Sequence, residues 1–106
     1  MIEWTDTVDA QQVPEGEIME YVLDGEILAI AHFEQHFFVV DGICPHQGGS
    51  LGKGTLHPSH PCLIRCPWHG WEYEMDTGQH LSIPAVSIGT FETRVLDGVV
   101  QVRRQT

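Results

Sequence analysis

The segments Cys44-Pro45-His46 and Cys66-Pro67-Trp68-His69 decide the architecture of this chain of 106 residues. Each segment carries one cysteine and one histidine, the side chains that bind zinc and iron most tightly. In an ordinary zinc finger, one half of the site supplies two cysteines and the other supplies two histidines. Here each loop mixes the two types. Mixed loops suit a two-iron cluster in which one iron takes both thiolates and the other takes both imidazoles, because each loop then reaches both irons.

The similarity to known sequences extends past these four side chains. Residues 44–51 read CPHQGGSL, residues 66–73 read CPWHGWEY, and Asp76-Thr77-Gly78 and Pro84 follow. This pattern resembles the Rieske [2Fe–2S] signature, Cys-x-His followed by Cys-x-x-His, with a proline loop over the cluster. The resemblance covers about forty residues, and the flanking segments match only in being strand-like. The spacing between the two pairs is slightly longer than usual, and we expect residues 57–61 to take up the extra length as a surface loop.

The resemblance implies a role for each ligand. Cys44 and Cys66 are expected to bind the inner iron as thiolates, and His46 and His69 to bind the outer iron through one ring nitrogen each. One Rieske-type [2Fe–2S] cluster per chain is the cofactor implied. The alternative is a structural zinc site with the same four ligands. Colour separates the two, because Zn²⁺ is d¹⁰ and colourless.

The residues around the ligands predict a low reduction potential. In high-potential relatives each cluster loop carries an additional cysteine, and the two form a disulfide; the matching positions here are Gly49 and Trp68. Those relatives also place a serine hydroxyl on a bridging sulfide, where this chain has Trp71. Tyr73 matches a tyrosine near a ligand sulfur, but a strand aromatic that packs on the base explains it equally well. We therefore expect a potential near the lower end of the Rieske range, about −150 mV.

Composition excludes several classes of protein. Fifteen acidic and five basic residues give a net charge of −10, so nucleic acid and anionic membranes are poor partners. No apolar run approaches the roughly 20 residues that cross a bilayer, and no secretory signal follows Met1. We expect a cytoplasmic monomer that docks transiently on larger redox proteins. Three cysteines cannot pair completely, and Cys62 is expected to be a free thiol with no functional role.

Turn signals at short intervals predict an all-β fold. Asp24-Gly25 and Asp97-Gly98 each separate two strand-like runs, which is typical of type I′ hairpins. Only residues 6–12 favour a short helical turn. By resemblance, the fold is a Rieske fold of stacked antiparallel sheets, a single domain over residues 1–106 with a cluster-binding subdomain at about 42–82 inserted into a base built from both ends. The expected strands cover residues 18–23, 26–33, 36–40, 63–65, 71–75, 91–96 and 99–103.

These features predict an electron carrier and not an enzyme. Rieske oxygenases join such a domain to a mononuclear iron domain, and this chain is too short to hold one. The resemblance implies a ferredoxin that takes one electron from a flavin reductase and delivers it to a terminal oxygenase. A small subunit of a nitrite-reductase-like complex and a structural zinc-binding module remain alternatives. The docking patch is expected around the cluster, at Pro45, Gln47, Pro67, Trp68 and Pro84.

Overall fold

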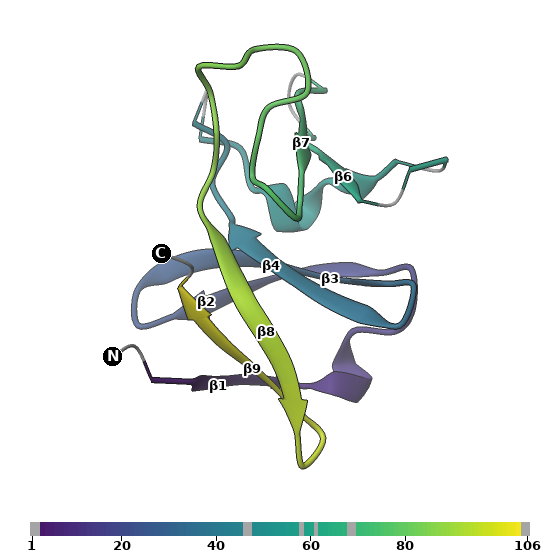
Figure 1. The fold of residues 1–106 in the computed structure, drawn as a ribbon, viewed down its shortest axis with the longest axis vertical. Helices are drawn as coiled ribbons and strands as arrows, with labels where there is room; N and C mark the ends of the chain where they lie inside the picture. Colours follow the sequence, from purple (N-terminus) through teal and green to yellow (C-terminus); the bar gives the residue numbers. More distant parts are fainter. Residues whose placement is uncertain (1–2, 46–47, 58, 61, 68–69, 105–106) are drawn as a thin grey trace.

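Two antiparallel sheets, one stacked above the other, make up the fold (Figure 1). The computed structural model describes residues 3–45, 48–57, 59–60, 62–67 and 70–104. One sheet has six strands in the order β1-β9-β8-β4-β3-β2, and the other has three in the order β5-β6-β7. The all-β prediction is confirmed. In chain order the elements are β1 (Thr5–Asp9), the 3₁₀ turn η1 (Ala10–Gln12), β2 (Ile18–Leu23), β3 (Glu26–Phe33), β4 (His36–Asp41), the 3₁₀ turn η2 (Leu51–Lys53), β5 (Thr55–Leu56), β6 (Leu63–Arg65), β7 (Glu72–Glu74), β8 (Thr90–Leu96) and β9 (Val99–Arg104).

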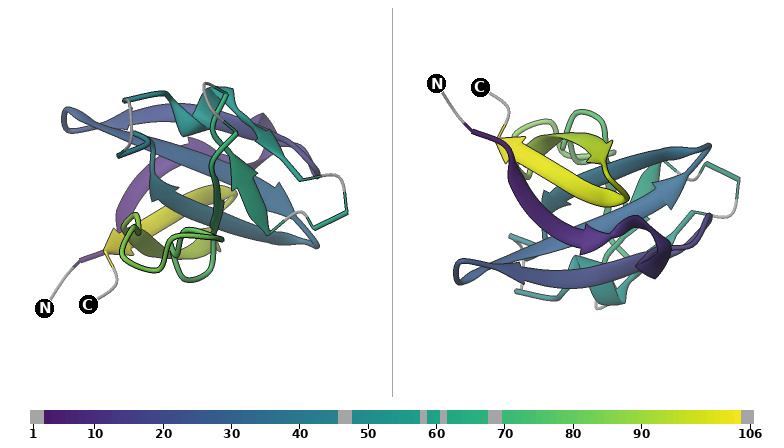
Figure 2. Two further views of the ribbon diagram at one scale, coloured as in Figure 1. Left: turned by 90° about the horizontal axis from the view of Figure 1, so that it is seen from above. Right: turned by 90° about the horizontal axis from the view of Figure 1, so that it is seen from below.

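The six-stranded sheet is built from both parts of the chain that flank the small sheet. We call residues 3–41 and 90–104 the base, and residues 42–89, which lie between β4 and β8, the insert. Views from above and below show that the base curves round on itself (Figure 2), with β1 paired to β9. In the described part of the chain, no helix is long and apolar enough to cross a membrane.

Tight turns fix the register of the base. Asp24-Gly25 and Asp97-Gly98 have positive φ at both residues, as type I′ turns require. They place Leu23 opposite Glu26 and Leu96 opposite Val99. The turn between β3 and β4, at residues 34–35, also has positive φ without a glycine. Here the Glu15 carboxylate accepts the backbone N–H groups of both turn residues at 2.6 and 3.0 Å, which offsets the conformational cost.

The helical prediction for residues 6–12 is largely wrong. Residues Thr5–Asp9 form β1, which pairs with β9, and only Ala10–Gln12 make a single 3₁₀ turn. The Asp9 carboxylate caps that turn by accepting the N–H of Gln11 at 2.9 Å. Pairing with a strand more than ninety residues away outweighs the weak local preference for a helix, because it satisfies a row of backbone groups at once.

Alternate residues of β3 serve two separate cores. Leu28 and Ile30 face the interior of the curved base, whereas Ala29, Ala31 and Phe33 face the insert. All five side chains are buried. This strand is therefore covered on both faces. The core on the insert side also contains Cys44, Leu51, Ile64, Cys66, Tyr73, Met75 and Ile88, so the cysteines of both loops are packed against the base sheet.

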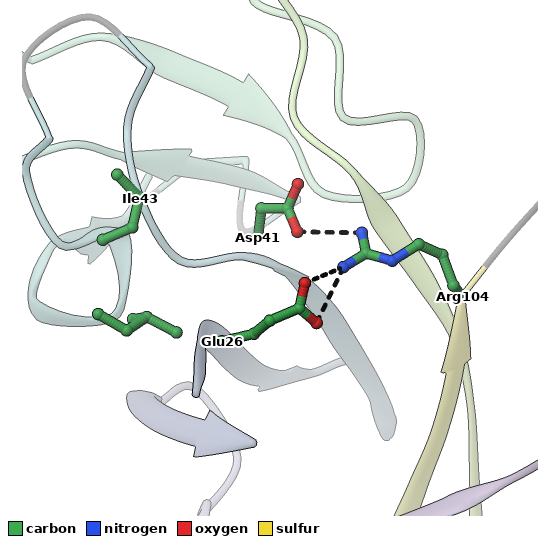
Figure 3. A pocket seen from close by; sticks show the side chains of 5 residues that line it. Glu26, Asp41, Ile43 and Arg104 are labelled. Carbon is green, nitrogen blue, oxygen red and sulfur yellow. Dashed lines mark hydrogen bonds and ion pairs between the residues drawn. The ribbon is translucent and has the colours of Figure 1, made fainter. Parts of the chain in front are cut away.

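A clasp joins the two points where the chain enters and leaves the insert. The N–H of Asp41 donates to the carbonyl of Gly89 at 2.9 Å, and the N–H of Gly89 donates to the Asp41 carboxylate at 2.8 Å. Arg104 holds that carboxylate at 3.1 Å and Glu26 at 3.2 Å (Figure 3). The strands β4 and β8 pair only through Val39–Phe91 and Val40–Thr90. The contacts of the clasp therefore lengthen the short stretch over which these two strands are held together.

Candidate metal centre

The first cysteine loop is closed by a pair of backbone hydrogen bonds. The N–H of Cys44 donates to the carbonyl of Gly49 at 2.8 Å, and the N–H of Gly48 donates to the carbonyl of Cys44 at 2.9 Å. Gly48 adopts a φ of 73°, which a residue with a side chain rarely tolerates. The loop starts directly after β4, and a Cβ at Gly42 would lie 2.8 Å from the backbone of Leu28. The close packing of Gly42 on the base sheet therefore fixes the position of Cys44.

The second cysteine loop repeats this hydrogen-bond pattern residue for residue. The N–H of Cys66 donates to the carbonyl of Trp71 at 2.8 Å, and the N–H of Gly70 donates to the carbonyl of Cys66 at 3.1 Å. Gly70 has a φ of 69°. Each cysteine thus bonds the residues four and five positions further on, and each loop has its glycine at the fourth position. Two loops with the same hydrogen-bond pattern follow strands of different sheets, β4 and β6.

Both thiols are buried, and the Cys44 sulfur contacts the hydroxyl group of Tyr73. Cys44 and Cys66 are 2% and 3% exposed, and neither forms a disulfide with another described residue. The Tyr73 hydroxyl lies 3.3 Å from the Cys44 sulfur, and Tyr73 itself is fully buried on β7. Burial raises the pKa of Tyr73 far above its usual value, and the hydrogen bond to Cys44 and the charges of both thiols raise it further. The phenol therefore stays protonated, and it is available to donate its hydrogen to a thiolate at Cys44.

This geometry resolves the two interpretations of Tyr73. Its ring packs in the core between insert and base, and its hydroxyl also reaches a predicted ligand sulfur. Two thiolates buried in an apolar core are costly unless a cation compensates them. The donor set and its surroundings therefore fit a thiolate-binding metal group. His46 and His69 lie outside the described residues, so their role stays a prediction. Among the residues described, no three potential ligands gather as a metal site.

His80 lies beside the site, with its ring against Trp71 and Tyr73. It is 6% exposed, and its Nδ1 accepts the N–H groups of Ser82 and Ile83 at 2.9 and 3.0 Å. Its ring meets Trp71 and Tyr73 edge-on, with centroids 4.6 and 5.2 Å apart. Burial lowers the pKa of His80, which keeps the ring neutral. With Nδ1 as acceptor, the ring proton is on Nε2, a buried atom without a partner among the described residues.

The third cysteine is not part of this group. Cys62 is a free, half-buried thiol, and its backbone carbonyl accepts the N–H of Met75 at 2.8 Å. Burial raises the pKa of its thiol, and Asp76 adds smaller effects of both signs. A protonated thiol is a weak nucleophile and a weak ligand. The absence of a functional role for Cys62 stays a prediction.

Comparison with known proteins identifies the class. The Rieske [2Fe–2S] domain matches residues 3–92, so the chain belongs to the Rieske [2Fe–2S] family. The resemblance seen in the two cysteine loops is confirmed. The cofactor of the family is the Rieske-type [2Fe–2S] cluster, and the pair of buried thiols fits it.

Individual relatives are of two kinds. The chain is 31% identical to the ferredoxin component of the alkene monooxygenase system of Xanthobacter autotrophicus, over 95% of this chain and 81% of that protein. It is 34% identical to cholesterol 7-desaturase nvd of Xenopus laevis, over 76% of this chain but only 18% of that much longer protein.

Solved structures give the same picture. A chain from the complex of reduced oxygenase and oxidised ferredoxin in carbazole 1,9a-dioxygenase superposes with a TM-score of 0.84 at 30% identity, and the match covers 97% of this chain and 96% of that one. A putative NADH-dependent nitrite reductase small subunit from Mycobacterium tuberculosis superposes with a TM-score of 0.87, over 100% of this chain and 98% of that one. At 22% identity, the second likeness shows the fold alone.

Proposed function

We propose that this protein is a one-electron carrier that passes electrons from a flavin reductase to a terminal Rieske oxygenase. The observation that carries the proposal is the pair of loops with the same hydrogen-bond pattern, each of which holds a buried cysteine, with the Cys44 sulfur in contact with the Tyr73 hydroxyl. Ferredoxin components of oxygenase systems match this chain over most of their own length. The protein is thus an electron-transfer component of a multicomponent system and does no chemistry on the final substrate.

The proposal assigns a role to each side chain. Cys44 and Cys66 hold the inner iron, and His46 and His69 hold the outer iron. When bound, the [2Fe–2S] cluster supplies reversible storage of one electron. Tyr73 donates its hydrogen to the Cys44 sulfur and so favours the more negative, reduced state. The apolar core on the insert side keeps water away from both thiolates.

The same proposal extends to the surroundings of the site. Residues 1–106 act as a single domain, with the cluster-binding part at about residues 42–82, in a cytoplasmic monomer. Docking takes place around the cluster and dissociates quickly, as small redox interfaces do. The exposure of Pro45, Pro67 and Pro84 supports this part of the proposal. Gln47 and Trp68, which were predicted for the same patch, lie outside the described residues.

The second candidate is a small subunit of a nitrite-reductase-like complex. It is favoured by the TM-score of 0.87 to a putative subunit of that kind, a likeness of fold alone. Stable co-purification with a large subunit would distinguish it from a free carrier. A structural zinc-binding module is the third possibility, and it requires a colourless protein that contains zinc and no inorganic sulfide.

One experiment tests the carrier proposal. The protein is purified without oxygen, its iron and sulfide are counted, and the dithionite-reduced form is examined by electron paramagnetic resonance. We expect two irons and two sulfides per chain, as a [2Fe–2S] cluster requires, a coloured protein and a one-electron Rieske signal. Cys66→Ser should abolish the signal, whereas Cys62→Ser serves as the matched control and should keep it. A folded, iron-free protein would refute the proposal.

A further inference from the structure

Charge is divided unequally between the base and the insert. Of the fifteen acidic and five basic residues, only three acidic and two basic residues fall in the insert, which leaves twelve acidic and three basic residues in the base. The base therefore carries almost all of the net charge of −10. The insert, which holds both cysteine loops, is close to neutral. The molecule is strongly polarised along the direction from base to insert.

The three basic residues of the base are all engaged. Arg94 donates to Gln101 at 2.7 Å, and Arg103 pairs with Glu92 at 3.0 Å. Both guanidinium groups also stack on the ring of Trp4, each 4.4 Å from its centroid. Arg104 belongs to the clasp described above. Each of the three arginines would have to break an existing contact before it could bind a partner protein.

The two basic residues of the insert, Lys53 and Arg65, differ from the arginines of the base in their contacts. Both are exposed, and neither makes an ion pair with any residue that the structure describes. Together they line a hollow of about 450 Å³, whose other walls are Gly54, Thr55, Cys66, Pro67 and Gly70. We call this hollow the basic notch. It opens directly beside the second cysteine loop.

Fixed elements place both cations at this spot. Lys53 ends η2, which sits tightly on β2, because a Cβ on Gly52 would lie 2.7 Å from the backbone nitrogen of Glu20. Arg65 ends β6, and its guanidinium lies over Gly70, where a Cβ would come within 2.9 Å of it. The glycine that closes the second cysteine loop thus also leaves room for the guanidinium.

We propose that the basic notch receives a carboxylate side chain of the redox partner, next to the electron-accepting site of that partner. This inference rests on the carrier function proposed above. An arginine beside a lysine fits a carboxylate, because the guanidinium binds both of its oxygens and the ammonium adds a point charge. The hollow has room for the carboxylate, and among the described residues neither cation has an ion-pair partner to lose.

The uneven distribution of charge between base and insert also orients the molecule as it approaches its partner. An acidic face on the partner repels the base and attracts the notch, so that the molecule approaches with its insert first. Such steering acts over about 10 Å at 0.1 M salt and fades as salt is added. The notch then holds the second cysteine loop against the partner.

The first test compares two double variants of the cluster-loaded protein that remove the same number of charges. Lys53→Gln/Arg65→Gln removes the notch cations, and Arg94→Gln/Arg103→Gln removes two cations of the base. The reduced proteins are mixed in a stopped-flow instrument with ferricyanide, an anion, or with tris(1,10-phenanthroline)cobalt(III), a cation. Each oxidant takes one electron, to give ferrocyanide or the cobalt(II) complex, and no bond to the protein forms or breaks.

We expect the notch variant to react roughly tenfold more slowly with ferricyanide at low salt, and faster with the cobalt complex. The base variant should change less than about twofold, because Arg94 and Arg103 lie on β8 and β9 of the base and line no part of the notch. In 0.5 M salt the difference between the variants should vanish. Equal effects in both variants would overturn the proposal, since net charge alone would then explain them.

The second test reads binding without electron transfer. The amide signals of Gly54 and Thr55 are followed by nuclear magnetic resonance during titration with N-acetyl-Glu-Glu amide, and with inorganic phosphate at the same ionic strength. Saturable shifts with the peptide, lost in the notch variant, support a carboxylate site. Equal shifts with phosphate would overturn it. A protein without a reducible cluster would refute the carrier function, whereas a working cluster with no peptide shifts would refute only the notch.

Discussion

Replacement of Tyr73 by phenylalanine isolates one hydrogen bond at the predicted cluster. The substitution removes the hydroxyl that lies 3.3 Å from the Cys44 sulfur and keeps a ring of nearly the same volume in the core. A hydrogen bond to a charged acceptor contributes about 1.5–3 kcal/mol. Reduction adds one negative charge that spreads over the whole cluster, so we assign about a third of that contribution, roughly 0.5–1 kcal/mol, to the difference between the two redox states.

That difference corresponds to a fall in reduction potential of about 20–45 mV, because about 59 mV equals 1.4 kcal/mol for one electron. The potential is measured by spectroelectrochemical titration at pH 7. Tyr21→Phe is the matched control, since Tyr21 is the other tyrosine of the chain and lies on β2 of the base. A shift below about 10 mV for Tyr73→Phe, less than a quarter of a kcal/mol, would refute the reasoning. So would an equal shift in the control.

Three further predictions concern the surroundings of the site. Cys62→Ser should leave a coloured, reducible protein, since Cys62 lies outside the group formed by the other two thiols; bleaching would show that it has a role. Burial lowers the pKa of His80 in the folded protein. As the pH falls, His80 is therefore protonated in the unfolded chain before it is protonated in the folded protein. The free energy of unfolding should then decrease below pH 6.5, with a slope of at most about 1.4 kcal/mol per pH unit. In urea titrations between pH 5 and 8, His80→Gln should lose this part of the slope, and an unchanged slope would contradict the assignment. Gly89→Ala should lower the free energy of unfolding by about 1–3 kcal/mol, because its Cβ would lie 2.6 Å from both Arg104 Nη1 and Asp41 Oδ2; a urea midpoint equal to that of the native protein would show that the clasp gives way freely.

The sequence predicts most of the strands because their signals are local. Asp24-Gly25 and Asp97-Gly98 mark their turns by residue type, and the runs on either side lie within a residue or two of the observed strands. The segment 5–9 shows the limit of this reasoning. Its partner in β9 is distant in sequence, and no local pattern announces the pairing.

In the site too, the sequence predicts the features with a local signal and does not predict the contacts between distant segments. Residue type and spacing single out Cys44 and Cys66, and resemblance singles out Tyr73, but the contact between Tyr73 and the Cys44 sulfur depends on how two sheets pack. The position of His80 against Trp71 and Tyr73 likewise follows from the loop after β7 folding back over that strand. Such contacts join segments that carry no mutual signal in a single sequence. The low reduction potential stays a prediction until it is measured.

The pairing of β1 with β9 brings the first and the last strand of the chain side by side in the base, whereas both cysteine loops belong to the insert. A linker, surface anchor or fused domain attached near either strand would therefore leave those loops facing outward. Tethered to an electrode through β1 or β9, the molecule should still present its redox end to the solution.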